Sequence, residues 1–157
     1  MNISNSSWLD FNPVAQSFTL LDFSKTFFDD AKIFMKKKYG KHKHWGYLEQ
    51  SRYIESIFLC NVSNSLILKH RVNQSGFWDY IILDGYERIK TLHSFLNNDL
   101  CLQNLLHISE LNGFNYEYIM RNFPKISNTF SYYQLSIIIL PHDTPDEYLK
   151  NVYNCKD

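Results

Sequence analysis

Hydrophobic residues recur at helical spacing in three long segments of the chain. Residues 24–38 place hydrophobic side chains on one face and charged ones elsewhere, and they end in basic residues before Gly40. Residues 47–60 and 87–96 repeat hydrophobic positions at steps of three and four residues. We therefore predict an amphipathic helix over each of these three segments.

Other segments carry the pattern of strands or short helices. Residues 65–70 and 77–83 are rich in β-forming side chains and flank a turn-like segment, which predicts a hairpin. Residues 133–140 are dense in Ile and Leu, as in a buried strand. We expect a short helix over 115–122, and residues 144–147 (Thr-Pro-Asp-Glu) have the capping-box pattern that begins a last helix. Because helices and strands mix without strict alternation, the sequence predicts an α+β fold.

The composition is that of one globular domain. The 157 residues are 45% hydrophobic and 17% aromatic, which is enough to build a core. No stretch approaches the roughly 18 apolar residues of a membrane span, and the first residues lack the pattern of a signal peptide. We therefore expect a cytoplasmic protein without a membrane partner. We interpret residues 1–38 as an N-terminal extension with an amphipathic helix and residues 39–157 as the domain itself.

Charge and ligand spacing limit the partners. Sixteen basic residues balance 16 acidic ones, so the chain has no overall attraction to nucleic acid or anionic lipid. A local positive patch lies at residues 36–43, and we expect any contact with DNA there. His42 and His44 have no third ligand in their block, and the cysteines lack the spacing of a zinc site. We therefore predict no metal centre built from these residues.

The segment with the clearest candidate chemistry is Asp84-Gly85-Tyr86-Glu87-Arg88, between a predicted strand and a predicted helix. A glycine there allows a sharp turn, after which the unpaired N–H groups of the helix can face an anion. Arg88 adds a planar cation that suits phosphate, and Asp84 could orient Arg88 or hold a metal or a water molecule. The alternative is structural: Asp84 caps the helix, and Arg88 pairs with Glu87 or Asp84 on the surface. Spacing alone leaves both interpretations open.

A family resemblance is carried by this loop and by an earlier block. Asp84, Gly85 and Arg88 match an Asp-Gly-Gln-Gln-Arg loop, with Tyr86 and Glu87 in place of the two glutamines. The earlier block is 39–45, in which Tyr39 and Trp45 match a Tyr-Gln-Arg-x-Tyr-x-Trp pattern and Lys41 replaces its arginine; Ile54-Glu55-Ser56-Ile57 follows. These features resemble the DUF262 domain, the N-terminal part of GmrSD-type modification-dependent restriction enzymes, in the ParB/sulfiredoxin-like superfamily.

The resemblance implies a small mixed sheet flanked by helices and a nucleotide site. It suggests a nucleoside triphosphate with Mg as the cofactor and a C-terminal nuclease that we do not expect in this chain. The positions carried over as catalytic are Asp84 and Glu87, and those carried over as nucleotide- or phosphate-binding are Gly85, Tyr86, Arg88, Lys41, Tyr39 and Trp45. An ionised Glu87 would repel phosphate unless a metal or Lys41 compensates, so this replacement argues against simple retention of triphosphate hydrolysis.

Two functional hypotheses follow. In the first, the chain is a nucleotide- or phosphate-binding domain linked to restriction or phage defence, and Arg88 and Lys41 share an anion. In the second, it is a catalytically silent relative that acts by protein contact, as an inhibitor or mimic of a defence enzyme. The sequence names neither the nucleotide, nor the protein partner, nor the oligomeric state.

Overall fold

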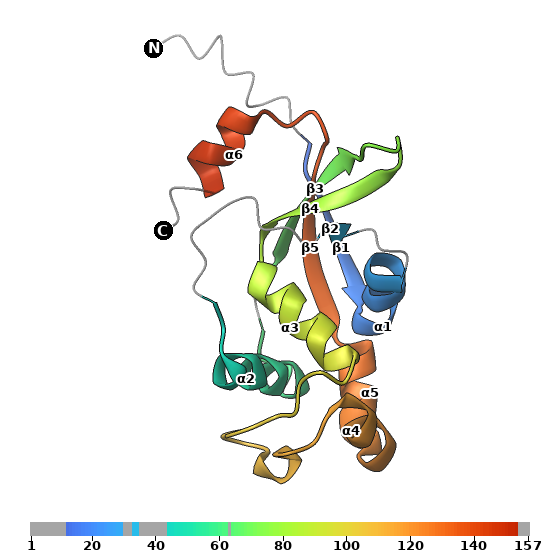
Figure 1. The fold of residues 1–157 in the computed structure, drawn as a ribbon, viewed down its shortest axis with the longest axis vertical. Coiled ribbons are helices and arrows are strands. Elements are labelled where there is room, and N and C mark those ends of the chain that lie inside the picture. The colour runs from blue at the N-terminus through green and yellow to red at the C-terminus, as the bar shows by residue number, and fades with distance from the viewer. Residues whose placement is uncertain (1–11, 30–32, 35–43, 63, 154–157) are drawn as a thin grey trace.

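One mixed β-sheet organises the part of the chain that the computed structural model describes, residues 12–29, 33–34, 44–62 and 64–153 (Figure 1). The sheet has five strands in the order β1-β5-β3-β4-β2. They are β1 (Val14–Thr19), β2 (Ile33–Phe34), β3 (Leu66–Val72), β4 (Trp78–Asp84) and β5 (Gln134–Leu140). β1 with β5 and β3 with β4 are antiparallel, whereas β3 with β5 and β2 with β4 are parallel.

Helices fill the connections that this strand order requires. α1 (Leu20–Phe23) and a π-helix (Ser24–Asp29) follow β1, and α2 (Tyr47–Phe58) precedes β3. The parallel pairing of β3 with β5 needs a long crossover, because β4 runs back beside β3. That crossover contains α3 (Tyr86–Leu96), a 3₁₀ turn (Ser109–Leu111), α4 (Tyr116–Asn122) and α5 (Pro124–Tyr132). α6 (Asp146–Tyr153) follows β5 and lies at the other end of the molecule from α2, α4 and α5 (Figure 1).

The two faces of the sheet carry separate hydrophobic clusters, because successive strand residues point to opposite sides. Leu66, Leu68 and Ile137 belong to the main core, and the main core also takes side chains from α1, α2, α3 and α5. On the opposite face, α6 contributes Leu149 to a smaller cluster. The other buried members of that cluster are Ile81, Leu83 and Leu140.

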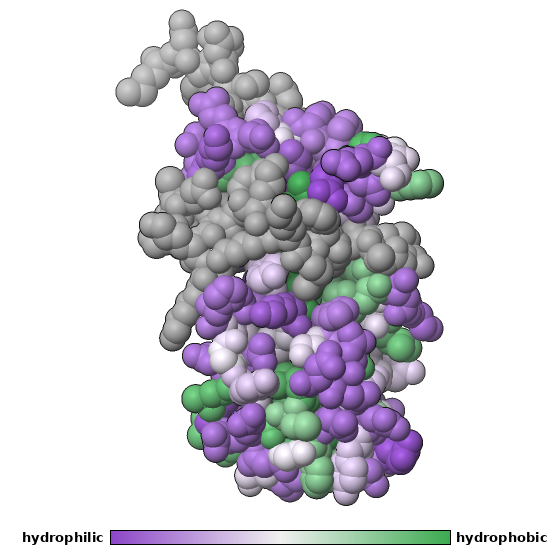
Figure 2. Space-filling view, in the orientation of Figure 1, coloured by the Kyte–Doolittle hydropathy of each residue, from purple (hydrophilic) through white to green (hydrophobic). Residues whose placement is uncertain are grey.

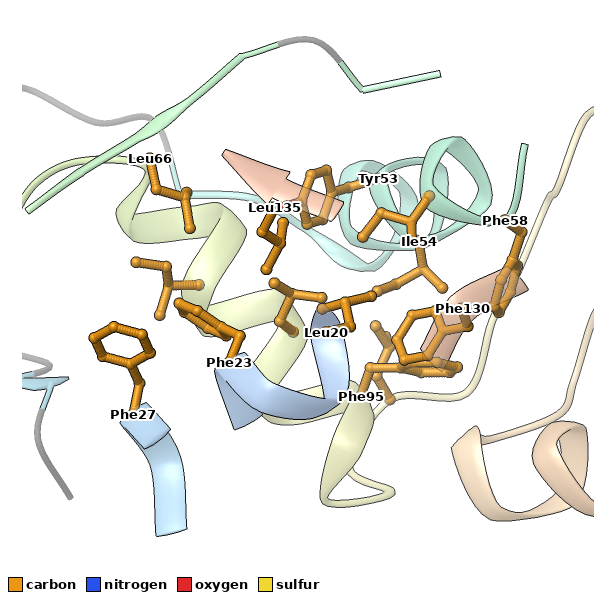
Figure 3. Packing of buried hydrophobic residues seen from close by; sticks show 14 of the residues in the cluster. Leu20, Phe23, Phe27, Tyr53, Ile54, Phe58, Leu66, Phe95, Phe130 and Leu135 are labelled. Carbon is orange, nitrogen blue, oxygen red and sulfur yellow. The ribbon is translucent and has the colours of Figure 1, made fainter. Parts of the chain in front are cut away.

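Aromatic rings make up much of the main core. Phe58, Phe95 and Phe130 come from three different helices, and their ring centroids lie 5.4 to 6.1 Å apart. A second group forms around Phe23 and Phe27, whose ring centroids are 4.8 Å apart. Figure 3 shows the Leu20 side chain between the two groups. Edge-to-face and tilted contacts of this kind add to the stabilisation from burial alone.

The predicted α+β class is confirmed, and so are most of its elements. The predicted helices over 47–60 and 87–96 correspond to α2 and α3, and the hairpin and the Ile-rich strand correspond to β3, β4 and β5. In the part of the chain that the structure describes, no helix is long and apolar enough to cross a membrane. The ParB/sulfiredoxin-like assignment is finer than the fold class and stays a prediction.

The prediction of one helix over residues 24–38 is wrong. The described part of this segment is a π-helix that ends at Asp29, followed by strand β2 at Ile33–Phe34, which pairs with β4. Phe27 is buried, as expected for its hydrophobic face, but the pairing of Ile33 and Phe34 with the sheet edge replaces further helical turns. Residues 12–29 and 33–34 therefore contribute two strands and buried side chains to the same sheet and core as the other described residues.

Buried polar groups on α2 hold the long segment between α3 and α4. Glu55 is buried, and its Oε1 accepts hydrogen bonds from the backbone N–H groups of His107 and Ile108 at 2.7 and 3.2 Å. Arg52 donates to Oε2 of the same carboxylate, and Ser51 Oγ accepts from the backbone N–H of Gln103. Burial would raise the pKa of Glu55, but these backbone and side-chain donors outweigh burial and lower its pKa below the ordinary value. Glu55 therefore contributes stability in its ionised form.

We expect Glu55→Gln to lower the free energy of unfolding at pH 7 by about 1 to 3 kcal/mol, because hydrogen bonds to a buried carboxylate become weaker neutral ones. A carboxyl whose pKa is lowered by folding stabilises the protein above its unfolded pKa of about 4.3 and loses that effect as the pH falls through the folded pKa. Urea unfolding at pH 7 and pH 3 should therefore show a difference between wild type and variant that shrinks at pH 3. Glu117→Gln, in an exposed pair with Arg121, is the control and should change little at either pH. A difference that stays constant between the two pH values would contradict this role for Glu55.

Candidate functional site

Gly85 sets the geometry of the predicted loop. β4 ends at Asp84 and α3 begins at Tyr86, with Gly85 between them in the left-handed region at φ 96°. The backbone at Gly85 is also buried, and a Cβ atom placed there would collide with the Leu66 side chain. The predicted sequence of strand, tight turn and helix is confirmed, and only glycine satisfies both the backbone angle and the close approach to β3.

The Arg88 guanidinium is bound within the chain. Nη1 donates to the backbone carbonyl of Asn64 at 2.6 Å, and Nη2 donates to the carbonyl of Ser65 at 3.1 Å. Nη2 also pairs with Oδ2 of Asp84 at 3.2 Å. The Arg88 side chain is only 13% exposed, whereas that of Asp84 is 48% exposed. Arg88 therefore ties the residues that lead into β3 to the first turn of α3.

Glu87 joins the two sequence blocks that resemble the family. Its side chain is 6% exposed, and Oε2 accepts a hydrogen bond from the backbone N–H of Trp45 at 3.2 Å. Nδ1 of His44 lies 3.3 Å from Oε1 of the same carboxylate. Next along the chain, the backbone N–H of Gly46 donates to Glu49 at 3.0 Å, at the start of α2. Residues 44–46 are thus positioned against the N-terminus of α3, although they are far from it in sequence.

Aromatic side chains line the same region. The Trp45 ring is half-buried and lies 5.5 Å from that of Tyr53 on α2. Burial raises the pKa of Tyr53, and the nearby Arg88 guanidinium opposes this effect without overcoming it. The Tyr53 hydroxyl is therefore neutral at physiological pH. Tyr86 is also half-buried and packs against the main core, as Trp45 does.

The structure thus brings most of the predicted site residues together. They are Asp84, Gly85, Tyr86, Glu87, Arg88 and Trp45. Tyr39, Lys41 and the basic patch at 36–43 lie outside the described residues, so the predicted sharing of an anion by Arg88 and Lys41 is untested. Sequence analysis did not find the carbonyls of Asn64 and Ser65 or the Tyr53 side chain. Backbone acceptors leave no signal in a sequence, although the four-residue spacing of Asp84 and Arg88 did indicate their pairing.

This arrangement favours internal cohesion over the binding of phosphate. The most accessible acidic group of the loop is Asp84, while the carboxylate of Glu87 lies buried in the first turn of α3, close to where a phosphate at the helix N-terminus would bind. An ionised carboxylate at the N-terminus of the helix would repel a phosphate bound there. Among the described residues, no three His, Cys, Asp or Glu side chains are grouped so that they could hold a metal ion.

No protein-family model, curated protein or solved structure matches this chain. The resemblance to DUF262 domains therefore stays a prediction that rests on the sequence blocks quoted above. The geometry of the loop has to be interpreted from its own contacts.

We expect Gly85→Ala to destabilise the protein more than Gly113→Ala. Both glycines have positive φ, which costs other residues about 1 to 2 kcal/mol, but a Cβ at Gly113 meets no atom within 4 Å. At Gly85 the collision with Leu66 adds a cost of about 1 to 3 kcal/mol for overpacking. Equilibrium unfolding in urea measures both variants. Equal losses would show that the contact with Leu66 relaxes freely.

Arg88→Ala should lower the free energy of unfolding by about 1 to 3 kcal/mol, because it removes hydrogen bonds from a charged donor to two backbone carbonyls, of which that of Ser65 is partly buried. The matched control is Arg121→Ala, which breaks an exposed ion pair with Glu117 at the same spacing of four residues and should cost under about 1 kcal/mol. Thermal and urea unfolding followed by circular dichroism compare the two. If both variants unfold alike, Arg88 does not hold the fold together.

Proposed function

We propose that this chain is a catalytically silent relative of DUF262 domains that acts by contact with another protein. The observation that carries the proposal is that the Arg88 side chain is already hydrogen-bonded within the chain. Its guanidinium is held by two backbone carbonyls and by Asp84, so the cation that would bind a phosphate is already used within the fold. Glu87 adds a buried carboxyl group in the first turn of the same helix.

A rigid hairpin supplies a surface for such a contact. The ends of β3 and β4 that lie at the upper right of Figure 1 are joined by a turn, at which Phe77 is 71% exposed and Val72 is 47% exposed. In Figure 2, hydrophobic side chains protrude at the upper right, where this hairpin ends. Exposed hydrophobic residues that are grouped in this way mark protein contacts more often than isolated ones do.

The turn is also preorganised. Oδ1 of Asn73 accepts hydrogen bonds from the backbone N–H groups of Ser75 and Phe77, and the Asn73 N–H donates to the Phe77 carbonyl. Further back, Arg71 and Asp79 face each other across the strands and form an ion pair through two hydrogen bonds. A hairpin that is already ordered loses little conformational entropy when a partner binds.

The resemblance suggests the partner. A full-length GmrSD-type enzyme contains the domain that this chain resembles, and a silent copy could occupy a surface that the enzyme uses for its own assembly. We place this contact in the cytoplasm, where such an enzyme meets DNA.

The first test concerns phosphate. We expect neither pyrophosphate nor tripolyphosphate, with or without Mg, to raise the melting temperature, and we expect no release of phosphate from ATP or GTP. Stabilisation by tripolyphosphate that is lost in Arg88→Lys, together with phosphate release, would replace this proposal with the nucleotide-responsive domain.

The second test concerns the partner. Purified chain and a purified GmrSD-type enzyme are mixed, and binding is measured by interferometry alongside the DNA cleavage of the enzyme. We expect binding that Phe77→Ser weakens at least tenfold, while Tyr132→Ser, an equally exposed aromatic residue at the end of α5, leaves it unchanged. No binding, or equal effects of both variants, would exclude the hairpin as the contact surface for this partner.

A further inference from the structure

A cavity lies on the sheet, away from the loop at Gly85. It has a volume of about 510 Å³, which lies in the range of small-molecule sites. His70 lies two residues beyond Leu68 on β3, so both share the sheet face that carries the main core, but His70 is beyond the part covered by helices. The lining comes from β1, β3, β4, β5 and the residues beside them: Asn12, Val14, Gln16, His70, Trp78, Ile139, Pro141 and His142.

Aromatic rings form one wall of this cavity. The Trp78 ring stands nearly perpendicular to the rings of His70 and His142, with centroids 5.8 and 5.3 Å away. These two ring contacts hold the indole in place, yet Trp78 remains 55% exposed. Ile139 and Val14, which pair across β5 and β1, provide the apolar part of the lining. A flat ring could therefore stack on a fixed indole above an apolar surface.

The lining offers polar side chains that can form hydrogen bonds. None of the described lining residues is Lys, Arg, Asp or Glu, and Asn12 and Gln16 each offer one amide donor group and one acceptor. Nδ1 of His70 is buried and has no hydrogen-bond partner among the described residues. Burial, and then the nearby charge of His142, lower the pKa of His70, so its imidazole is neutral at pH 7. A neutral imidazole can donate from one ring nitrogen and accept at the other.

We propose that this cavity binds a planar, uncharged heteroaromatic ring of purine size, stacked on Trp78 and recognised at its edge by Gln16, Asn12 and His70. The two amides offer donors and acceptors for the edge of such a ring, and His70 lines the cavity with them. Because the described lining holds no Lys or Arg, phosphate groups attached to the ligand should add nothing to its affinity. This site is separate from the loop at Gly85, and it does not depend on the protein contact proposed above.

Adenosine and guanosine are the probes, with ribose as the control for the sugar and AMP as the control for phosphate. Titration calorimetry should give saturable binding of at least one nucleoside, no binding of ribose, and an affinity for AMP within about threefold of that for adenosine. Tryptophan fluorescence should be quenched by the nucleoside, and the quenching should persist in Trp45→Phe but be lost in Trp78→Phe. A short single-stranded DNA that contains the same base distinguishes a base within nucleic acid from a free nucleoside, according to which of the two binds more tightly.

Three variants test the contacts. Trp78→Ala should weaken binding at least tenfold, as should His70→Phe, which keeps the ring and removes its nitrogens, and Gln16→Leu, which keeps the size and removes the amide. Tyr132→Ala removes an exposed aromatic side chain at the opposite end of β5 and should bind like the wild type. Circular dichroism confirms that each variant is folded before it is scored. The absence of saturable nucleoside binding, wild-type affinity in both His70→Phe and Gln16→Leu, or AMP binding more than tenfold tighter than adenosine would overturn the proposal.

Discussion

The three hydrogen-bond acceptors around the Arg88 guanidinium fix how α3 packs against the sheet. Asn64 and Ser65 lead into β3, Asp84 ends β4, and Arg88 itself belongs to α3, so one side chain joins three elements. Its planar group carries donors on separate nitrogens, whereas a lysine at this position would have to reach all three acceptors from a single nitrogen. Gly85 allows the approach, since any larger residue would push Leu66 and β3 away. The packing of α3 over the sheet, and hence of Phe95 in the core, depends on this joint.

The residue type at position 87 decides part of the chemistry of this loop. A glutamine at this position would offer an amide donor to a bound anion, whereas a carboxylate only accepts hydrogen bonds at neutral pH. In this chain the carboxylate accepts from the backbone of Trp45, and His44 lies beside it. The same position therefore serves to attach residues 44–46 to α3. Glu87 and Arg88 thus direct their polar groups to other parts of the chain, whereas Asp84 remains half exposed.

Local patterns predicted most of the elements, and they missed the strands β1 and β2, whose partners are distant in sequence. α2 and α3 follow from hydrophobic spacing, and the turn at Gly85 follows from a glycine between a strand and a helix. β1 has no strong alternation of its own and exists because β5 offers an edge to pair with. The short helix predicted over 115–122 is present as α4, but α5, which begins at Pro124, was not predicted, although proline favours the first position of a helix. At the candidate site, the sequence indicated the pair of Asp84 and Arg88 but not the backbone carbonyls that take up the rest of the guanidinium.

The pairing of β1 with β5 affects how the chain can fold during synthesis. The Ser17 side chain donates a hydrogen bond to the Gln134 side chain, although the two residues are 117 positions apart in sequence. All six residues of β1 pair with β5 alone. On the ribosome, β1 and the hydrophobic residues just after it emerge long before their partner strand exists. Leu20 and Phe23 thus stay without their final packing until most of the domain has been translated, and they are accessible to chaperones for that whole interval. Closure of the sheet by such distant segments is a slow step, because the loop entropy must be lost before the contacts form.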